Sequence, residues 1–77
     1  MPHIVVKLLP GRSEQQKARL AEQIVKDVVA IAKCEEDAVS VAIEEVQQED
    51  WLEKVYKPEI LPNLKRLYKQ PGYDPFK

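Results

Sequence analysis

The sequence of 77 residues has one cysteine, one histidine and no excess of either charge. A single cysteine excludes an internal disulfide and a zinc cluster built on cysteines. A single histidine likewise argues against a histidine-rich metal site within one chain. Twelve basic and thirteen acidic residues give a net charge of −1. Neither a nucleic acid nor an anionic membrane is therefore expected as a partner.

Long apolar runs are also missing. No stretch approaches the roughly 18 apolar residues that a membrane span needs. The first seven residues lack the basic and apolar regions of an export signal, so we expect a cytoplasmic protein. The length fits one domain, 1–77, and a domain of this size buries only about 60% of its unfolded surface. Without a disulfide or metal, self-association is the usual remaining source of stability.

The first half of the chain has clear signals of regular structure. Residues 3–9 are rich in β-branched and apolar side chains and end at Pro10-Gly11, which predicts a strand and a turn. Ser13 with Gln16 three residues later is the pattern of a helix capping box. Apolar residues with helical spacing then predict an amphipathic helix from Glu14 to Lys33. Its apolar positions are Leu20, Ala21, Ile24, Val25, Val28, Ile31 and Ala32.

A second strand is predicted over residues 39–46, where apolar side chains alternate with smaller or polar ones. Strand, helix and strand form a βαβ unit over residues 3–46 with parallel strands, so the fold class is α/β. One helix covers only one face of a two-stranded sheet. We therefore expect a homo-oligomer that completes a larger sheet.

Residues 47–77 predict a C-terminal helical extension and tail. Residues 49–56 indicate one or two helical turns, and Pro58 is expected to break an element or to start one. Apolar residues between Ile60 and Tyr68 indicate a second amphipathic helix. Pro71-Gly72 is expected to end it and to leave a short tail.

Pro2 is the first candidate for chemistry. Removal of an initiator methionine, common before a small residue, leaves proline with a free secondary amine as the N-terminus. Burial near apolar walls or cations disfavours an ammonium group and lowers its pKa toward neutrality, the range that general acid–base catalysis needs. The alternative is a proline at a strand start, where the missing N–H costs nothing.

Arg12 is the second candidate, because it lies in the turn before a helix start that favours anions. Its guanidinium suits a carboxylate, and the alternative is an ordinary surface arginine. His3 is expected to be a structural or interface residue. Trp51, the only tryptophan, is expected to be a core or interface aromatic. Cys34 precedes two glutamates, which disfavour a nucleophilic thiolate.

The chain combines three motifs: Met1-Pro2 at a strand start, Gly11-Arg12-Ser13-Glu14-Gln15-Gln16-Lys17 at the helix start, and Val39-Ser40-Val41-Ala42-Ile43-Glu44-Glu45 on the second strand. With these motifs it resembles the 4-oxalocrotonate tautomerase family of the tautomerase superfamily, over roughly residues 2–51. The C-terminal stretch, with Trp51 and Lys69-Gln70-Pro71-Gly72-Tyr73, is similar to the PptA-type subgroup.

The resemblance implies a βαβ fold that assembles as dimers or trimers of dimers. It also implies a cofactor-independent isomerase that interconverts enol and keto forms of small 2-oxo acids. Pro2 matches the family's catalytic proline, Arg12 its carboxylate-binding arginine, and Trp51 an aromatic that keeps the site apolar. Ser40 stands where the family commonly has a second arginine, which favours a monocarboxylate such as enol-phenylpyruvate. His3 and Ser40 complete the expected set of substrate contacts.

Pro2 and Arg12 are expected to lie far apart within one chain. Pro2 and Arg12 flank a strand of about seven residues, which spans roughly 23 Å. We therefore expect Arg12 of a partner chain at each site. The longer C-terminus favours a homodimer over a hexamer. Two alternatives stay open. One is a dehalogenase or hydratase at the same proline, with Glu44 or Glu45 as the available water-activating group. The other is a non-catalytic oligomeric binding module of the same fold.

Overall fold

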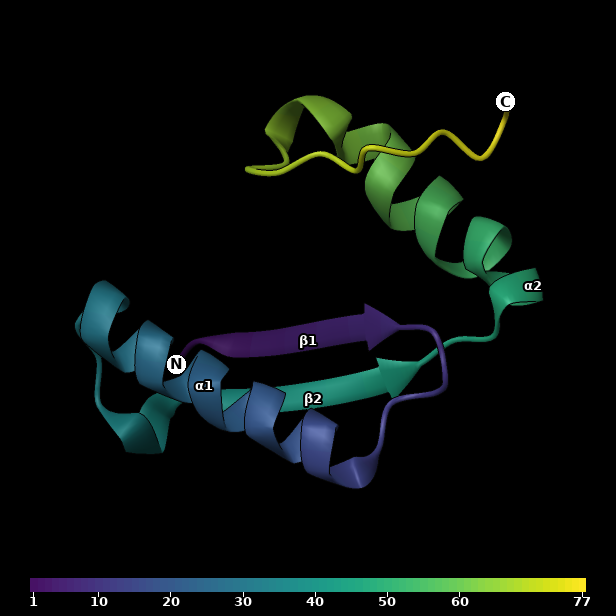
Figure 1. Cartoon of the computed structure of the whole chain (residues 1–77). Coiled ribbons are helices and arrows are strands. Elements are labelled where there is room, and N and C mark those ends of the chain that lie inside the picture. Colours follow the sequence, from purple (N-terminus) through teal and green to yellow (C-terminus); the bar gives the residue numbers. More distant parts are fainter. The chain divides into compact units, whose positions relative to one another are not determined.

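The structure, a computed structural model, describes residues 1–77, and the chain divides into two compact units, residues 1–45 and 46–77. The first unit contains β1 (His3–Leu8), α1 (Glu14–Ala32), the short 3₁₀ turn η1 (Glu36–Ala38) and β2 (Ser40–Glu45) (Figure 1). The second unit contains α2 (Gln48–Trp51), the π-helical segment η2 (Leu52–Ile60) and the 3₁₀ segment η3 (Leu61–Arg66). None of these helices combines the length and the apolar character that a bilayer crossing requires.

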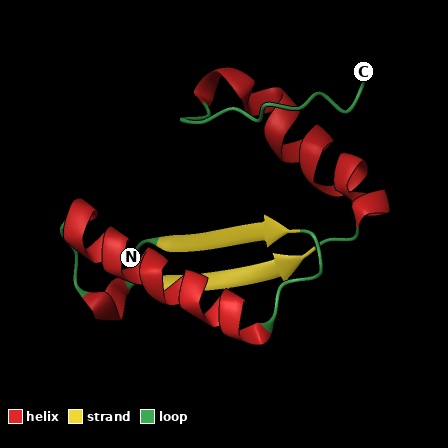
Figure 2. Cartoon of the chain, in the orientation of Figure 1, coloured by secondary structure: helices red, strands yellow, loops and turns green.

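The two strands form a parallel pair, and Figure 2 shows their arrows pointing the same way. The register runs from His3 opposite Ser40 to Leu8 opposite Glu45. The predicted βαβ unit with parallel strands is confirmed. Each strand is shorter than predicted, because Leu9 and Val46 lie beyond the last paired residues and have no partner in the ladder.

α1 begins with the predicted capping box. The Gln16 backbone N–H donates to Ser13 Oγ at 3.1 Å, and the Ser13 N–H donates to Gln16 Oε1 at 2.8 Å. Both bonds satisfy N–H groups that the first helical turn leaves without partners. The helix ends at Ala32, one residue earlier than predicted, because the backbone of Lys33 is left-handed with φ of 59°.

α1 covers one face of the sheet. Lys17 on α1 forms an ion pair with Glu45 at the end of β2, with 3.4 Å between Nζ and Oε2. Side chains alternate between the faces of a strand, so the opposite face, which α1 does not cover, carries His3 and Ser40. On that face Val5 is 43% exposed, and no side chain of the first unit reaches full burial. The βαβ unit of one chain therefore has no closed core.

The second unit differs from the prediction in its helices. Pro58 lies inside a helical run that continues from α2 through η3, and it neither breaks nor starts an element. The helix is wound so that Leu61 N–H bonds to the carbonyl of Tyr56, five residues earlier, which is π-helical bonding. The run ends at Arg66, and Tyr68, expected on an amphipathic helix, is fully exposed.

Aromatic packing provides the core of the second unit. Val55 and Tyr56 are 5% and 4% exposed. The Tyr56 ring contacts Tyr73 and Phe76, at centroid distances of 5.9 and 5.8 Å. Such tilted and edge-on pairs are favourable geometries for aromatic rings. The C-terminal tail is therefore packed on the helical segment of its own unit.

Candidate active site

Pro2, His3 and Ser40 lie together where the sheet begins. Pro2 is half-buried and directly precedes β1. The Ser40 backbone N–H donates to the Pro2 carbonyl at 3.1 Å. The Ser40 side chain forms a second bond, with 2.6 Å between its Oγ and His3 Nδ1. Ser40 therefore contacts both residues at the N-terminal end of β1.

The strand register accounts for this cluster. His3 is the Cα partner of Ser40 in the parallel ladder. Paired residues direct their side chains to the same face, which places the imidazole beside the hydroxyl on the face that α1 leaves open. Both residues are exposed in the single chain. Polar groups at this position are thus accessible to a small molecule or to a second chain.

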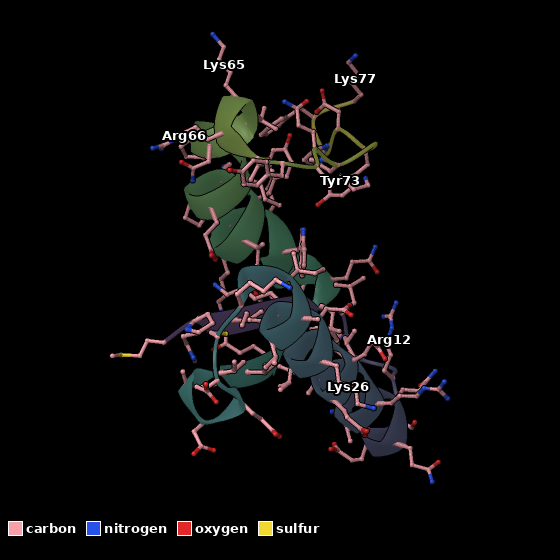
Figure 3. The ribbon with its side chains drawn as sticks, turned by 90° about the vertical axis from the view of Figure 1, so that its left-hand side faces the viewer. Arg12, Lys26, Lys65, Arg66, Tyr73 and Lys77 are labelled. Atoms are coloured by element: carbon pink, nitrogen blue, oxygen red, sulfur yellow. The ribbon has the colours of Figure 1, made fainter.

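Arg12 lies at the other end of β1, between the strand and α1. Its Nη1 donates to the carbonyl of Leu9 at 3.3 Å, and the residue is exposed. Figure 3 shows the residue near the start of α1 with its side chain projecting outward. The six residues of β1 span about 20 Å at about 3.3 Å per residue. One chain therefore does not bring Arg12 to Pro2.

Trp51 ends α2 and belongs to the second unit, whereas the other four predicted site residues belong to the first. It is half-buried, and its indole Nε1–H donates to Tyr73 Oη at 3.0 Å. The role of Trp51 beside Pro2 stays a prediction. Tyr73 had no predicted role, although it belongs to the stretch that carries the PptA-type resemblance.

Lys17 is an electrostatic link that the sequence did not reveal. Its side chain is only 16% exposed and pairs with Glu14 at 2.9 Å and with Glu45 at 3.4 Å. The hydrogen bond that Lys17 donates to Glu14 raises the pKa of the Lys17 ammonium above its ordinary value of 10.5, and the charges of both carboxylates act in the same direction. Lys17 thereby joins the start of α1 to the end of β2.

Glu44 and Glu45 lie at the far end of the sheet from Pro2. They pair with Lys7 and Leu8, the last residues of β1. Their side chains point to opposite faces, and Glu45 is engaged by the α1 lysine. Neither carboxylate of one chain is therefore beside Pro2 to activate a water molecule, as the dehalogenase and hydratase alternatives require.

An open groove of about 570 Å³ lies elsewhere, along α1 and η1. Its lining residues are Glu22, Val25, Lys26, Val29, Ala30 and Glu36. None of the predicted site residues lines it, and Glu22 and Lys26 pair with each other at 3.2 Å. No three histidine, cysteine, aspartate or glutamate side chains are grouped to hold a metal ion. The groove offers no arrangement for acid–base chemistry.

Comparison with known proteins decides the family. The family model for tautomerase enzymes matches residues 2–55, a span that starts at Pro2 and includes β1, α1, β2 and Trp51. The chain belongs to the tautomerase family. The resemblance to 4-oxalocrotonate tautomerases predicted from the sequence is thereby confirmed.

Relatives match this tautomerase over nearly its whole length. A probable tautomerase of Xylella fastidiosa (strain 9a5c) is 42% identical over 73 residues, which are 95% of this chain and 89% of the relative. Tautomerase PptA of Cronobacter sakazakii is 41% identical over 75 residues, 96% of this chain and 99% of the relative. The similarity includes the C-terminal residues beyond the family match.

The fold agrees with that of solved 4-oxalocrotonate tautomerase homologues. TomN, such a homologue in the tomaymycin biosynthetic pathway, superposes with a TM-score of 0.63 and 38% identity. The superposition covers 65% of this chain and 77% of TomN. Sequence and fold together make the protein a tautomerase-type enzyme.

Proposed function

We propose that this tautomerase interconverts the enol and keto forms of a small 2-oxo acid without a cofactor, and that the amine of Pro2 is its general acid–base. The observation that best supports this is the anchoring of Pro2 at the start of β1 by the Ser40 N–H. The anchor fixes the residue that would carry the reactive nitrogen. Met1 is fully exposed, so its removal, which frees that nitrogen, meets no steric barrier.

The proposed reaction moves one proton within the substrate. The neutral Pro2 nitrogen takes the proton of the enol hydroxyl, and the C2–O bond becomes a carbonyl as the electron pair shifts to C3. The protonated Pro2 then returns the proton to C3. One group thus acts as base and then as acid.

The other residues bind the substrate in this proposal. Arg12 holds the carboxylate as a fork of N–H donors, and Trp51 covers the site and excludes water. Because β1 separates Pro2 from Arg12 of the same chain, the arginine comes from the partner in a homodimer. Ser40 carries no charge, which suits a monocarboxylate with an aryl or alkyl group. Residues 1–77 act as a single domain in this assembly.

Substitution of Pro2 tests the proposal. We expect Pro2→Ala to lower kcat/KM for enol-phenylpyruvate by about a hundred-fold or more, because a positioned acid–base contributes at least that much. Pro75→Ala in the exposed tail is the control and is expected to keep wild-type turnover. Mass spectrometry of each preparation establishes whether Met1 is absent. Undiminished turnover by Pro2→Ala would refute the proposal.

A further inference from the structure

We propose that His3 is a substrate-contacting catalytic residue and that Ser40 is its positioning residue. His3 Nε2–H donates a hydrogen bond to the C2 oxygen of the substrate, and Ser40 sets the ring for this task. The proposal rests on the proposed function of Pro2 and adds a second polar contact at the same site. It assigns the side chain of His3 a catalytic role rather than a purely structural one.

The first support is the geometry of the pair. His3 Nδ1 and Ser40 Oγ are 2.6 Å apart, a short distance that is typical of a hydroxyl hydrogen bond. The bond is made at Nδ1, so the contact with Ser40 leaves Nε2, on the other side of the exposed ring, unused. Both residues are on the open face of the sheet. The imidazole is therefore held at one nitrogen and presents the other to solvent or to a ligand.

The second support is the position of the pair beside Pro2. His3 follows Pro2 in the chain, and the Ser40 backbone N–H donates to the Pro2 carbonyl at 3.1 Å. Ser40 on β2 thus bonds both to the backbone of Pro2, the proposed acid–base, and to the side chain of the adjacent His3. Pro2 and the exposed imidazole are therefore held at the same end of the sheet.

The contact with Ser40 determines which nitrogen of the His3 ring carries the proton and can donate a hydrogen bond to a substrate. A neutral imidazole carries one proton, and the hydrogen bond at one nitrogen determines which nitrogen holds it. When Ser40 Oγ–H donates to Nδ1, the proton of His3 is on Nε2, which becomes a donor. Loss of the enol proton to Pro2 develops negative charge on the C2 oxygen. A preorganised donor at that oxygen stabilises the transition state.

Two isosteric substitutions of His3 separate catalysis from structure. Asparagine places an amide near Nδ1 and keeps the contact with Ser40, whereas glutamine places one near Nε2. We expect His3→Asn to lower kcat/KM for enol-phenylpyruvate about ten-fold, mainly through kcat, as for one lost hydrogen bond. His3→Gln is expected to stay within about three-fold of wild type. A structural role predicts the reverse order, and that order would overturn the proposal.

Ser40 is tested through the tautomer of the only histidine. At about pH 8, where a free imidazole is neutral, nitrogen NMR shifts of His3 should report a proton on Nε2 in the wild type and in Ser40→Thr. Ser40→Ala should show mixed tautomers and a kcat lower by about three-fold. A proton on Nδ1 in the wild type would overturn the assignment.

Pro2→Ala, assayed in parallel, keeps the two proposals distinguishable. If Pro2→Ala loses activity while His3→Asn does not, the His3 inference fails and the proposed function stands. If the wild type does not turn over the enol, or Pro2→Ala remains active, the proposed function fails and the His3 inference falls with it.

Discussion

At the scale of single residues, Lys17 links two elements through charge. Its ammonium contacts carboxylates on α1 and β2 while its side chain is 16% exposed. A pair of this kind is screened less by solvent than the more exposed pair of Lys26 and Glu22, whose side chains are 65% and 68% exposed. We therefore expect Lys17 to contribute to stability and Lys26 to contribute little.

The raised pKa of Lys17 gives this contribution a pH dependence. Because the folded pKa is above the ordinary value of 10.5, the contribution is complete below that value and is lost as pH rises through the folded pKa. Urea unfolding of wild type and Lys17→Met at about pH 8 and at about pH 11.5 measures it. We expect a destabilised variant at the lower pH and a smaller difference at the higher one.

Lys26→Met is the matched control, and we expect it to differ little from wild type at both values of pH because its ion pair is exposed. A Lys17→Met difference that is equal at both pH values would contradict the assigned role of the charge. Such a result would point to the packing of the lysine stem instead.

The residues of the candidate site could be proposed from the sequence one at a time, but the contacts between them could not be predicted. Pro2, Arg12 and Trp51 were singled out by position and by family resemblance. The bond between His3 and Ser40 joins residues 37 positions apart, and it depends on the register of the two strands. Register is fixed by packing of the sheet against α1, which the local sequence does not specify.

At the scale of elements, the first half of the chain was predictable because each signal is local. The capping box of Ser13 and Gln16 lies within four residues, and the apolar spacing of α1 lies within one helix. The second half was not. Proline normally disrupts a helix because it lacks an N–H, but π-helical bonding around Pro58 lets the helix continue. Nothing in the spacing of apolar residues signals this change of winding.

The C-terminal tail is the element with the clearest testable contact. Tyr73 accepts the indole N–H of Trp51 at 3.0 Å and also packs against Tyr56. We expect Tyr73→Phe to keep the ring contact and to lose the hydrogen bond, at a cost of about 1 kcal/mol of folding free energy. Because Trp51 is the only tryptophan, its fluorescence and its quenching by acrylamide report the change directly.

Tyr68→Phe is the control for the tail, because Tyr68 is fully exposed. Its stability and tryptophan fluorescence are expected to match the wild type. Equal quenching in Tyr73→Phe and wild type would show that the tail does not hold the indole in solution.

At the scale of the whole molecule, a single chain has neither a closed core in its first unit nor a complete candidate site. α1 covers only one face of the sheet, the first unit has no fully buried side chain, and Pro2 and Arg12 are at opposite ends of β1. A two-fold dimer places each element of one chain against its equivalent in the other. In the dimer that we propose, the two β1 strands run antiparallel across that axis, which would bring Pro2 of one chain to Arg12 of its partner.

Mixing two inactive variants tests this shared site most directly. A hybrid dimer of Pro2→Ala and Arg12→Ala chains has one site with both native residues and one site with neither. Random mixing of equal amounts is therefore predicted to restore about a quarter of wild-type activity, although each variant alone is nearly inactive. Native mass spectrometry establishes that hybrids have formed. Hybrids that form without any gain in turnover would contradict a site built from two chains.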